Sequence, residues 1–229
     1  MAKESPTRKV LRIGHRGAGG HAPENTLASI EKAIALQCNL TEVDVQRTAD
    51  GSLILLHDER VDRTTNGTGP VAEMNLADVR KLDAGLGRNI PTLEETLKAA
   101  HGRIGLILEL KAEGLSYDVC GTVRASGFPR EIIYASFLHD ELQHVRRADP
   151  DASTLVLFTR LPKNPAAEAT RLQATHVGLR FNTVTQPLVK TLHKTGLVVF
   201  VYTVNKPVDI TRMRLLGVDG IVSDYPDRI

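Results

Sequence analysis

Short apolar runs alternate with longer segments of helical periodicity along this chain. Nine runs are rich in β-branched and other apolar residues, and they cover residues 10–14, 41–46, 52–57, 104–110, 132–137, 154–158, 176–180, 198–204 and 220–223. Between most of them, apolar residues recur at helical spacing near capping residues or prolines, as in residues 26–36, 93–100, 140–147 and 187–194. Because this alternation continues to the C-terminus, it predicts an α/β protein with a parallel sheet.

The turn after the first run helps to choose between two parallel-sheet architectures. A doubly wound sheet usually carries a G-x-G-x-x-G phosphate turn there, whereas this chain has Gly14-His15-Arg16-Gly17. An irregular (β/α)8 barrel is therefore the better prediction. Nine candidate strands are one too many for such a barrel, so one run is expected to lie outside it or to be assigned wrongly.

Two connections depart from a regular barrel. The second and third runs are separated only by residues 47–51, which is too short for a helical crossover, and Asp50-Gly51 is a hairpin-type turn. Such a hairpin would bring Asp44 opposite or close to His57. Residues 59–91 have weak periodicity and many turn formers, so we expect a small insertion after the third strand, over the barrel mouth. Residues 1–229 otherwise form one expected domain.

Charged and imidazole side chains lie at or beside the ends of apolar runs. In a barrel, the carboxyl ends of the strands share one rim, where active sites of such enzymes are built, so these residues should converge. Glu42 and Asp44 share parity on their strand and point to the same face, while Val43 and Val45 point to the other. The residues concerned are His15 with Arg16, Glu42 with Asp44, His57 with Asp58, and Glu109 with Lys111.

Each of these pairs has an ordinary structural explanation when it is taken alone. A strand carboxylate pair can face solvent, a histidine can close a turn or a loop, and Glu109 with Lys111 can form a surface ion pair. All four, however, end apolar strands, and burying such charges without partners costs several kcal/mol per ion. Together they favour a site. Three carboxylates without a nearby cysteine suit a divalent metal, Mg²⁺ or Ca²⁺, better than zinc.

Composition narrows the possible partners. The 229 residues are 41% hydrophobic, which is enough for one sizeable core, and the net charge of +2 comes from interspersed basic and acidic residues. Nucleic acid is not indicated. No apolar run approaches the roughly 18 residues of a transmembrane helix, and the polar start leads only to a short apolar run. We therefore expect a cytoplasmic protein without an integral membrane segment. Cys38 and Cys120 are expected to be reduced, buried thiols.

The motifs of this chain, in order, resemble those of the glycerophosphodiester phosphodiesterase family, in its short, cytoplasmic bacterial type. The resemblance covers about residue 10 to the end. The matching stretches are His15-Arg16-Gly17-Ala18, Ala22-Pro23-Glu24-Asn25-Thr26, Glu42-Val43-Asp44-Val45, His57-Asp58-Glu59, Asp62-Arg63-Thr64-Thr65-Asn66-Gly67-Thr68-Gly69, Ile90-Pro91-Thr92-Leu93, Glu109-Leu110-Lys111, Ser136-Phe137, Thr203-Val204-Asn205 and Gly217-Val218-Asp219-Gly220-Ile221.

The resemblance implies a fold, an activity and roles for these residues. The fold would be a TIM-type barrel with a small insertion, and the reaction would be metal-dependent hydrolysis of a small glycerophosphodiester, such as glycerophosphocholine or glycerophosphoethanolamine, to glycerol 3-phosphate and an alcohol. By this resemblance, Glu42, Asp44 and Glu109 hold the metal, His15 and His57 act as acid and base, and Arg16 and Lys111 hold the phosphate.

Two further residues are weaker candidates for substrate binding. Asn25 is predicted to contact the substrate, although it or Thr26 could instead cap the helix that follows. Tyr202 stands where many family members carry tryptophan, and this chain has no tryptophan at all. A smaller, more polar ring there puts the substrate preference in doubt. The remaining histidines show no ligand spacing and are treated as ordinary residues: His21, His101, His139, His144, His176 and His193.

Several alternatives stay open at the level of sequence. The nucleophile is either water or the neighbouring hydroxyl of the substrate's own glycerol. The sequence does not decide which histidine is the acid and which the base. Because His57, expected close to Asp44, is placed to activate the nucleophile, our working assignment makes His15 the acid. Rival functions are phospholipase D- or C-like cleavage of lysophospholipids and a non-catalytic barrel that binds an anionic metabolite. The choice between Mg²⁺ and Ca²⁺ and the oligomeric state are open.

Overall fold

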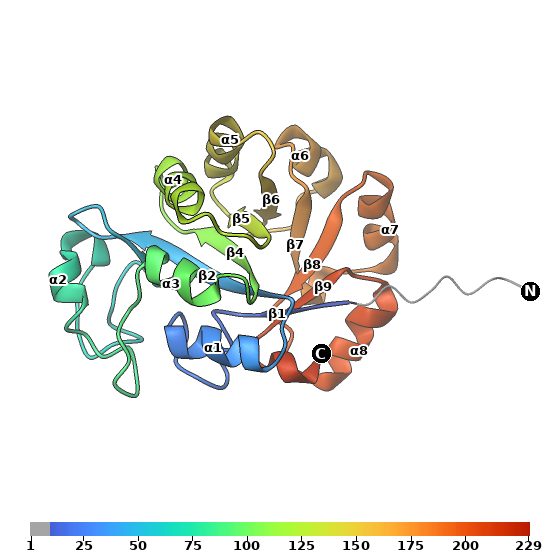
Figure 1. Ribbon diagram of the computed structural model, residues 1–229. Coiled ribbons are helices and arrows are strands. Elements are labelled where there is room, and N and C mark those ends of the chain that lie inside the picture. Colours follow the sequence, from blue (N-terminus) through green and yellow to red (C-terminus); the bar gives the residue numbers. More distant parts are fainter. Residues whose placement is uncertain (1–9) are drawn as a thin grey trace, which may run out of the picture.

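Eight parallel strands form a closed barrel at the centre of the molecule, with helices around it (Figure 1). This computed structural model describes residues 10–229; the polar N-terminal residues 1–9, on which the expected cytoplasmic location partly rests, lie outside the described residues. The ring runs β1-β2-β4-β5-β6-β7-β8-β9 and closes where β9 pairs with β1. The barrel strands are β1 (Leu11–Gly14), β2 (Leu40–Arg47), β4 (Gly105–Leu110), β5 (Ile132–Ser136), β6 (Ser153–Leu157), β7 (His176–Arg180), β8 (Val198–Tyr202) and β9 (Gly220–Ser223).

The ninth strand, β3 (Leu53–Leu55), lies outside the barrel. It pairs antiparallel with β2, with Val45 opposite Leu55, so the predicted hairpin is present and accounts for the surplus strand. Between the two strands, the Thr48 amide donates to the Ser52 carbonyl at 3.0 Å. Beyond β3, the Leu56 amide donates to the Asp44 carbonyl at 3.0 Å, which brings the following residue, His57, beside Asp44 as expected.

Helices cover the outside of the barrel. Two of them begin at a threonine whose side chain accepts from the backbone three residues on, in a capping box: Thr26 with Ser29, and Thr92 with Glu95. The α-helices are α1 (Leu27–Ala35), α2 (Leu76–Val79), α3 (Leu93–Ala100), α4 (Ser116–Ser126), α5 (His139–Ala148), α6 (Pro165–Arg171), α7 (Gln186–Lys194) and α8 (Pro207–Leu216), and the short 3₁₀ turns are Val71–Glu73, Phe181–Thr183 and Pro226–Arg228.

Alternation along the strands separates the barrel interior from the helix-facing layer. On β2, Val43 and Val45 pack outward in the cluster beneath α1 and α3, while Leu40 packs inward. The inward cluster fills the barrel with Ile13, Leu40, Ile107, Ile133, Ala135, Leu155, Leu157, Phe200 and Val222. The apolar interior thus supports the charged groups that lie further along the same strands.

Residues 59–91 follow β3 and pack around an apolar cluster of their own. This cluster joins Ile54 and Leu56 to Val61, Val71, Val79, Ala84 and Ile90. In Figure 1 the segment, with α2, lies to one side of the barrel next to β2. Its internal packing explains how a stretch with weak periodicity and many turn formers becomes ordered.

Two further findings bear on expectations from composition. Among residues 10–229, no helix is long and apolar enough to cross a membrane. Cys38 and Cys120 are both buried free thiols.

Candidate active site

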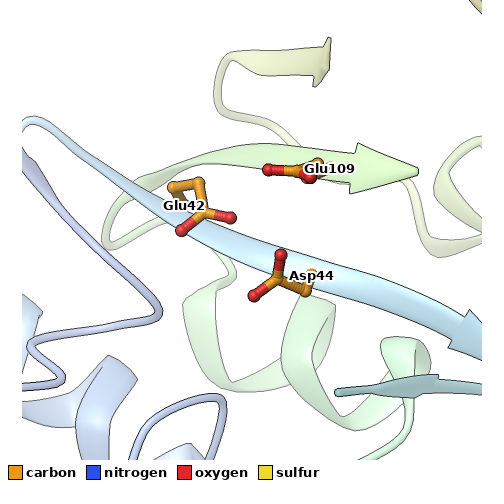
Figure 2. A group of neighbouring side chains, drawn as sticks. All are labelled: Glu42, Asp44 and Glu109. Carbon is orange, nitrogen blue, oxygen red and sulfur yellow. The ribbon is translucent and has the colours of Figure 1, made fainter. Parts of the chain in front are cut away.

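Three carboxylates meet inside the barrel where β2 and β4 lie side by side. Asp44 and Glu109 are register partners in the parallel ladder, and Glu42 lies two residues earlier on the same face of β2. One oxygen from each of the three carboxylates lies within 4.8 Å of the others. Figure 2 shows the three side chains directed toward a common space.

The electrostatics of this group call for a cation. All three carboxylates are buried. Burial, followed by the charge of Asp44, raises the pKa of Glu42 and that of Glu109. Glu42 Oε1 is buried and has no hydrogen-bond partner among the described residues. Three hard oxygen donors, one of them unsatisfied, fit a divalent metal ion.

Two cationic side chains approach the same carboxylates from different strands. Lys111, just after β4, places Nζ 2.6 Å from Glu109 Oε1 and 3.5 Å from Asp44 Oδ1. Arg16, just after β1, places Nε 3.5 Å from Asp44 Oδ2, and its backbone amide donates to Glu42 Oε2 at 2.9 Å. Burial would lower the pKa of both cations, but the neighbouring carboxylates outweigh it and raise the pKa of each. Both therefore stay charged.

His15 forms a hydrogen bond with Asp224, which is 209 residues away in the sequence. Its Nδ1 lies 2.6 Å from Asp224 Oδ1, and Asn205 donates to the other oxygen of Asp224 at 2.6 Å. A carboxylate at Nδ1 favours the hydrogen there and leaves Nε2, 4.0 Å from Glu42 Oε2, on the side of the carboxylates. Burial alone would lower the pKa of His15, but the bond to Asp224 and the charge of Glu42 raise it overall.

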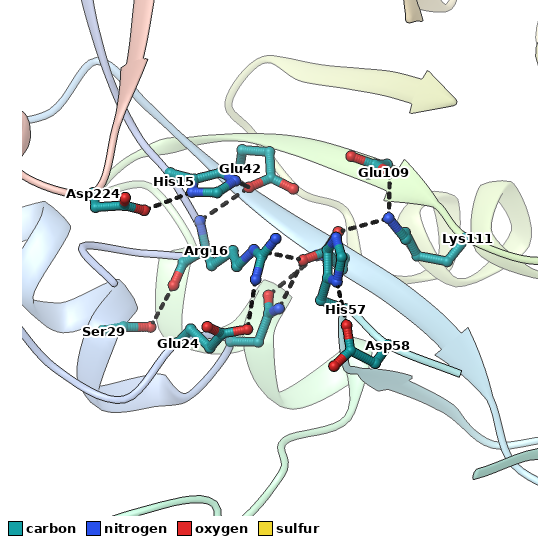
Figure 3. Close-up of polar contacts among 12 residues, drawn as sticks. His15, Arg16, Glu24, Ser29, Glu42, His57, Asp58, Glu109, Lys111 and Asp224 are labelled. Atoms are coloured by element: carbon teal, nitrogen blue, oxygen red, sulfur yellow. Dashed lines mark hydrogen bonds and ion pairs between the residues drawn. The ribbon is translucent and has the colours of Figure 1, made fainter. Parts of the chain in front are cut away.

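His57 has a carboxylate partner in the equivalent position. Its Nδ1 lies 2.6 Å from Asp58 Oδ1, and Arg63 Nε donates to Asp58 Oδ2 at 2.6 Å. The hydrogen bond from Arg63 is the largest influence in lowering the pKa of Asp58 to about 2. Figure 3 shows both histidines with their carboxylate partners, on either side of Arg16.

The loop between β1 and α1 holds the backbone of His15 and Arg16 tightly. Arg16 and Gly17 have φ values of 52° and 85°, in the left-handed region. The Ser29 hydroxyl, at the start of α1, donates to the Arg16 carbonyl at 2.9 Å. A Cβ on Gly17 would lie 2.2 Å from Ser29 Oγ, so only glycine allows α1 to approach this closely.

Asn25 supports the acidic group from outside the cavity. It is buried, its Nδ2 donates to Asp44 Oδ2 at 2.8 Å, and its Oδ1 accepts from the Asp44 amide at 3.1 Å. The helix cap is Thr26, which excludes capping as the role of the Asn25 side chain. Both ends of the Asn25 amide are thus used to hold Asp44 in place.

A cavity of about 290 Å³ opens beside these groups. Its polar wall includes His15, Arg16, Glu42, His57 and Glu109, whereas Asp44 and Lys111 are not among its lining residues. The opposite wall is mainly apolar and comes from β4 to β9 and the residues that follow them. It includes Ile107, Ala135, Phe137, Leu155, Leu157, Gly178, Arg180, Phe200, Tyr202, Thr203 and Val222.

Tyr202 belongs to this apolar wall. Its ring packs edge-on against Phe137, with 6.2 Å between centroids, and its hydroxyl donates to the Phe158 carbonyl at 3.4 Å. Burial raises the pKa of Tyr202 to about 12, so the phenol stays neutral. The structure therefore places Tyr202 on the other side of the cavity from the carboxylates.

Sequence reasoning gave no role to four residues that hold the site together: Asp224, Asp58, Glu24 and Arg63. Asp224 follows the last barrel strand, so the strand-end rule applied to the earlier strands could have found it. Asp58, Glu24 and Arg63 all stand inside motifs that were recognised. Nothing in the local pattern marks the partners of Arg63.

The chain was compared with known proteins. The model of the glycerophosphoryl diester phosphodiesterase family matches residues 15–228. YhdW of Bacillus subtilis is 38% identical over 232 residues, which cover 95% of each chain. A glycerophosphodiester phosphodiesterase of Caldanaerobacter subterraneus is 34% identical over 234 residues, covering 96% of each. The structure of an Oleispira antarctica phosphodiesterase in complex with its product sn-glycerol-3-phosphate matches with a TM-score of 0.88 at 28% identity, over 95% of this chain and 94% of that one.

The family match spans the whole site, from His15 to the segment beyond Asp224. Two of these relatives align along nearly their whole length, and the barrel is shared with the solved structure. His15, His57, Arg16, Glu42 and Glu109 line one cavity, and Asp44 and Lys111 contact these lining residues. On this basis the chain belongs to the glycerophosphoryl diester phosphodiesterase family.

Proposed function

We propose that this protein hydrolyses glycerophosphodiesters, such as glycerophosphocholine or glycerophosphoethanolamine, to glycerol 3-phosphate and an alcohol, using a divalent metal ion and two histidines. One observation carries the proposal: three buried carboxylates, two cations and two carboxylate-bound histidines converge beside one cavity. A phosphodiester needs positive charge around its nonbridging oxygens and proton transfer on both sides of the phosphorus, and this set can supply both.

The metal would be held by Glu42, Asp44 and Glu109. Oxygen donors without cysteine favour Mg²⁺ or Ca²⁺. A bound divalent ion would supply positive charge to the phosphate oxygens. The unsatisfied Glu42 Oε1 and the raised pKa of both glutamates support a cation between these side chains. Asn25, which holds Asp44 through both ends of its amide, would orient that ligand rather than contact the substrate.

The remaining residues divide the work of binding and proton transfer. Arg16 and Lys111 would hold the phosphate. His15 would donate a proton to the departing alkoxide, which its raised pKa supports because it favours the protonated ring near neutral pH. His57, which follows the residue paired with Asp44, would take a proton from the nucleophile. The nucleophile would be either water or the glycerol hydroxyl of the substrate.

The apolar wall would accept the leaving alcohol, with Tyr202 among its contacts. We propose that residues 59–91 belong to the same single domain and form part of the mouth, and the contacts of Arg63 with Glu24 and Asp58 support this. A cytoplasmic location is part of the proposal, and the two free thiols, Cys38 and Cys120, support it because unpaired cysteines are typical of a reducing compartment.

The test is release of glycerol 3-phosphate from glycerophosphocholine by the purified protein. Turnover should stop with a chelator and return with excess Mg²⁺ or Ca²⁺. Glu42→Gln, Asp44→Asn and Glu109→Gln should each abolish or greatly weaken it without unfolding the protein, while Glu94→Gln, at an exposed carboxylate of α3, should leave it unchanged. Full turnover in chelator would contradict the metal site.

Two rival functions predict other results in the same assay. A phospholipase D- or C-like enzyme would act faster on micellar lysophospholipid than on glycerophosphocholine. A non-catalytic barrel would bind the diester and release nothing. Release of choline phosphate in place of choline would mean that the other phosphoester bond is cut.

A further inference from the structure

We infer that Arg63, which lies in the inserted segment 59–91, is a positioning residue that fixes His57 and Arg16 relative to each other. This inference rests on the proposed function, since it assigns Arg63 a part in that reaction. Arg63 is absent from the lining of the cavity, so it acts through its neighbours. It also gives the insertion a role beyond covering one side of the barrel.

All three nitrogens of the Arg63 guanidinium are engaged. Nε donates to Asp58 Oδ2 at 2.6 Å, Nη1 donates to Glu24 Oε2 at 3.0 Å and Nη2 donates to Glu24 Oε1 at 2.8 Å. The planar fork of arginine suits this arrangement, in which two carboxylates approach from different sides. A lysine at this position could not make the same set of contacts.

Each of the two carboxylates also contacts a residue of the proposed site. Asp58 Oδ1, the oxygen that Arg63 does not contact, lies 2.6 Å from His57 Nδ1 in a hydrogen bond. Glu24 Oε1 accepts a hydrogen bond from Arg16 Nη1 at 2.7 Å, and the same oxygen accepts from Arg63 Nη2. A continuous chain of contacts therefore runs from His57 through Asp58, Arg63 and Glu24 to Arg16, and Arg63 stands at its centre.

Stability alone does not account for this arrangement. The Arg63 side chain is 48% exposed, and exposed ion pairs contribute about 0–1 kcal/mol. The geometric effect is larger because each carboxylate has a competing option. Without Arg63, Asp58 can rotate away from His57, and both oxygens of Glu24 become available to Arg16. The imidazole and the guanidinium would then both lose their fixed positions.

Arg63→Gln and Arg63→Lys test this role, with Arg60→Gln as the matched control. Arg60 belongs to the same inserted segment and pairs with Asp62 at 3.2 Å, and it is absent from the cavity lining. On glycerophosphocholine with saturating metal, Arg63→Gln should lower kcat by about 10-fold to 100-fold, the scale of a small misplacement of a reacting group. Arg63→Lys should fall in between, and Arg60→Gln should match the wild type. Thermal midpoints should stay within a few degrees.

A double-mutant cycle separates positioning from a general structural effect. Because part of the Arg63 effect passes through His57, Arg63→Gln should cost much less in a His57→Ala background than in the wild type. Equal losses in both backgrounds, or equal losses for Arg63→Gln and Arg60→Gln, would overturn the inference.

A readout independent of turnover separates this inference from the proposed function. In ¹H–¹⁵N spectra of the histidine rings, the His57 signal, identified by its loss in His57→Ala, should move in Arg63→Gln and stay in place in Arg60→Gln. A wild-type protein inactive on every glycerophosphodiester would defeat the proposed function and leave this spectral result decisive for Arg63. An unmoved His57 signal would refute the role of Arg63 even in an active enzyme.

Discussion

At the scale of single residues, the two histidines share one feature and differ in another. Each has a carboxylate 2.6 Å from Nδ1. Asp224 is shared with the neutral amide of Asn205, whereas Asp58 is shared with the cation Arg63. The carboxylate beside His15 therefore keeps its charge for the imidazole, while the one beside His57 is largely balanced by the guanidinium. Burial alone would lower the pKa of His15, but the bond to Asp224 and the charge of Glu42 raise it overall, which suits this ring to the role of the acid.

We expect the two histidine variants to differ in their sensitivity to the leaving group. The alkoxide of choline needs a proton to depart, whereas p-nitrophenolate does not. A general acid contributes about 10²-fold to 10⁴-fold to the rate only when the leaving group is poor. His15→Ala should therefore lose turnover of glycerophosphocholine and keep most of its turnover of a p-nitrophenyl phosphodiester. His57→Ala should lose both. The measurement is kcat/KM for each pair under saturating metal.

His101→Ala serves as the control, since His101 is exposed at the end of α3. If His57→Ala proves to be the variant that spares the activated ester, the acid and the base are exchanged. Equal damage to both substrates in both variants would rule out the division of labour itself.

Sequence patterns could identify the residues that lie at strand ends but not the partners that hold them. Glu42 and Asp44 are recognisable because they interrupt apolar runs at strand parity, and the structure brings them together with Glu109. Asp224 lies 209 residues away from His15, and no periodicity links them. The sequence left the helix cap open between Asn25 and Thr26, because the choice depends on a backbone angle, φ 55° at Asn25, that the sequence does not display.

At the scale of elements, the periodicity of the sequence predicted most strands and several helices, but it did not show how the strands pair. The nine strands were recognisable, but which one lies outside the barrel depends on hydrogen-bond partners, and only the antiparallel pairing of β3 shows it. The helical segments that we named correspond to α1, α3, α5 and α7. Of the others, α8 spreads its apolar and charged residues around the helix, so it carries little periodic signal.

The loop between β1 and α1 gives a prediction at this scale. Gly17→Ala should destabilise the protein by at least about 1–2 kcal/mol, the cost of a left-handed backbone for a residue with Cβ. Contact with Ser29 should add to this and displace His15 and Arg16, so kcat should fall as well. Gly121→Ala, within α4, meets nothing within 4 Å and should be neutral or stabilising by about 0.5–1 kcal/mol. Urea unfolding and turnover of both variants would show this difference, and equal behaviour would contradict it.

At the scale of the whole molecule, the charged and the apolar residues of the cavity come from different strands of the barrel. The charged groups come from the loops and strands around β1, β2 and β4, with Asp224 after β9, while the apolar wall of the cavity comes mainly from β5 to β8. The far end of the interior holds His176, at the start of β7, buried and 5.0 Å from the Phe200 ring between centroids. His176 has no part in the proposed site, but it is a titratable group buried in the core.

Burial lowers the pKa of His176 to about 4. The unfolded chain takes up a proton near pH 6.5, whereas the folded protein resists it down to about pH 4, so stability falls as the pH drops through this window. The loss amounts to roughly 3 kcal/mol at most. Unfolding free energies of the wild type and His176→Gln should therefore converge or cross between pH 7 and pH 4, because the other groups titrate alike in both. Curves that stay parallel would show that His176 does not contribute.

The contact between His15 and Asp224 sets an order of events during synthesis. The ribosome makes His15 209 residues before it makes Asp224, which follows β9. Until β9 and Asp224 have left the exit tunnel, β9 cannot pair with β1 to close the barrel, and His15 lacks its carboxylate. A nascent or prematurely terminated chain can therefore carry every proposed metal ligand and still lack the carboxylate partner of His15, so we expect turnover only from chains that extend past residue 224.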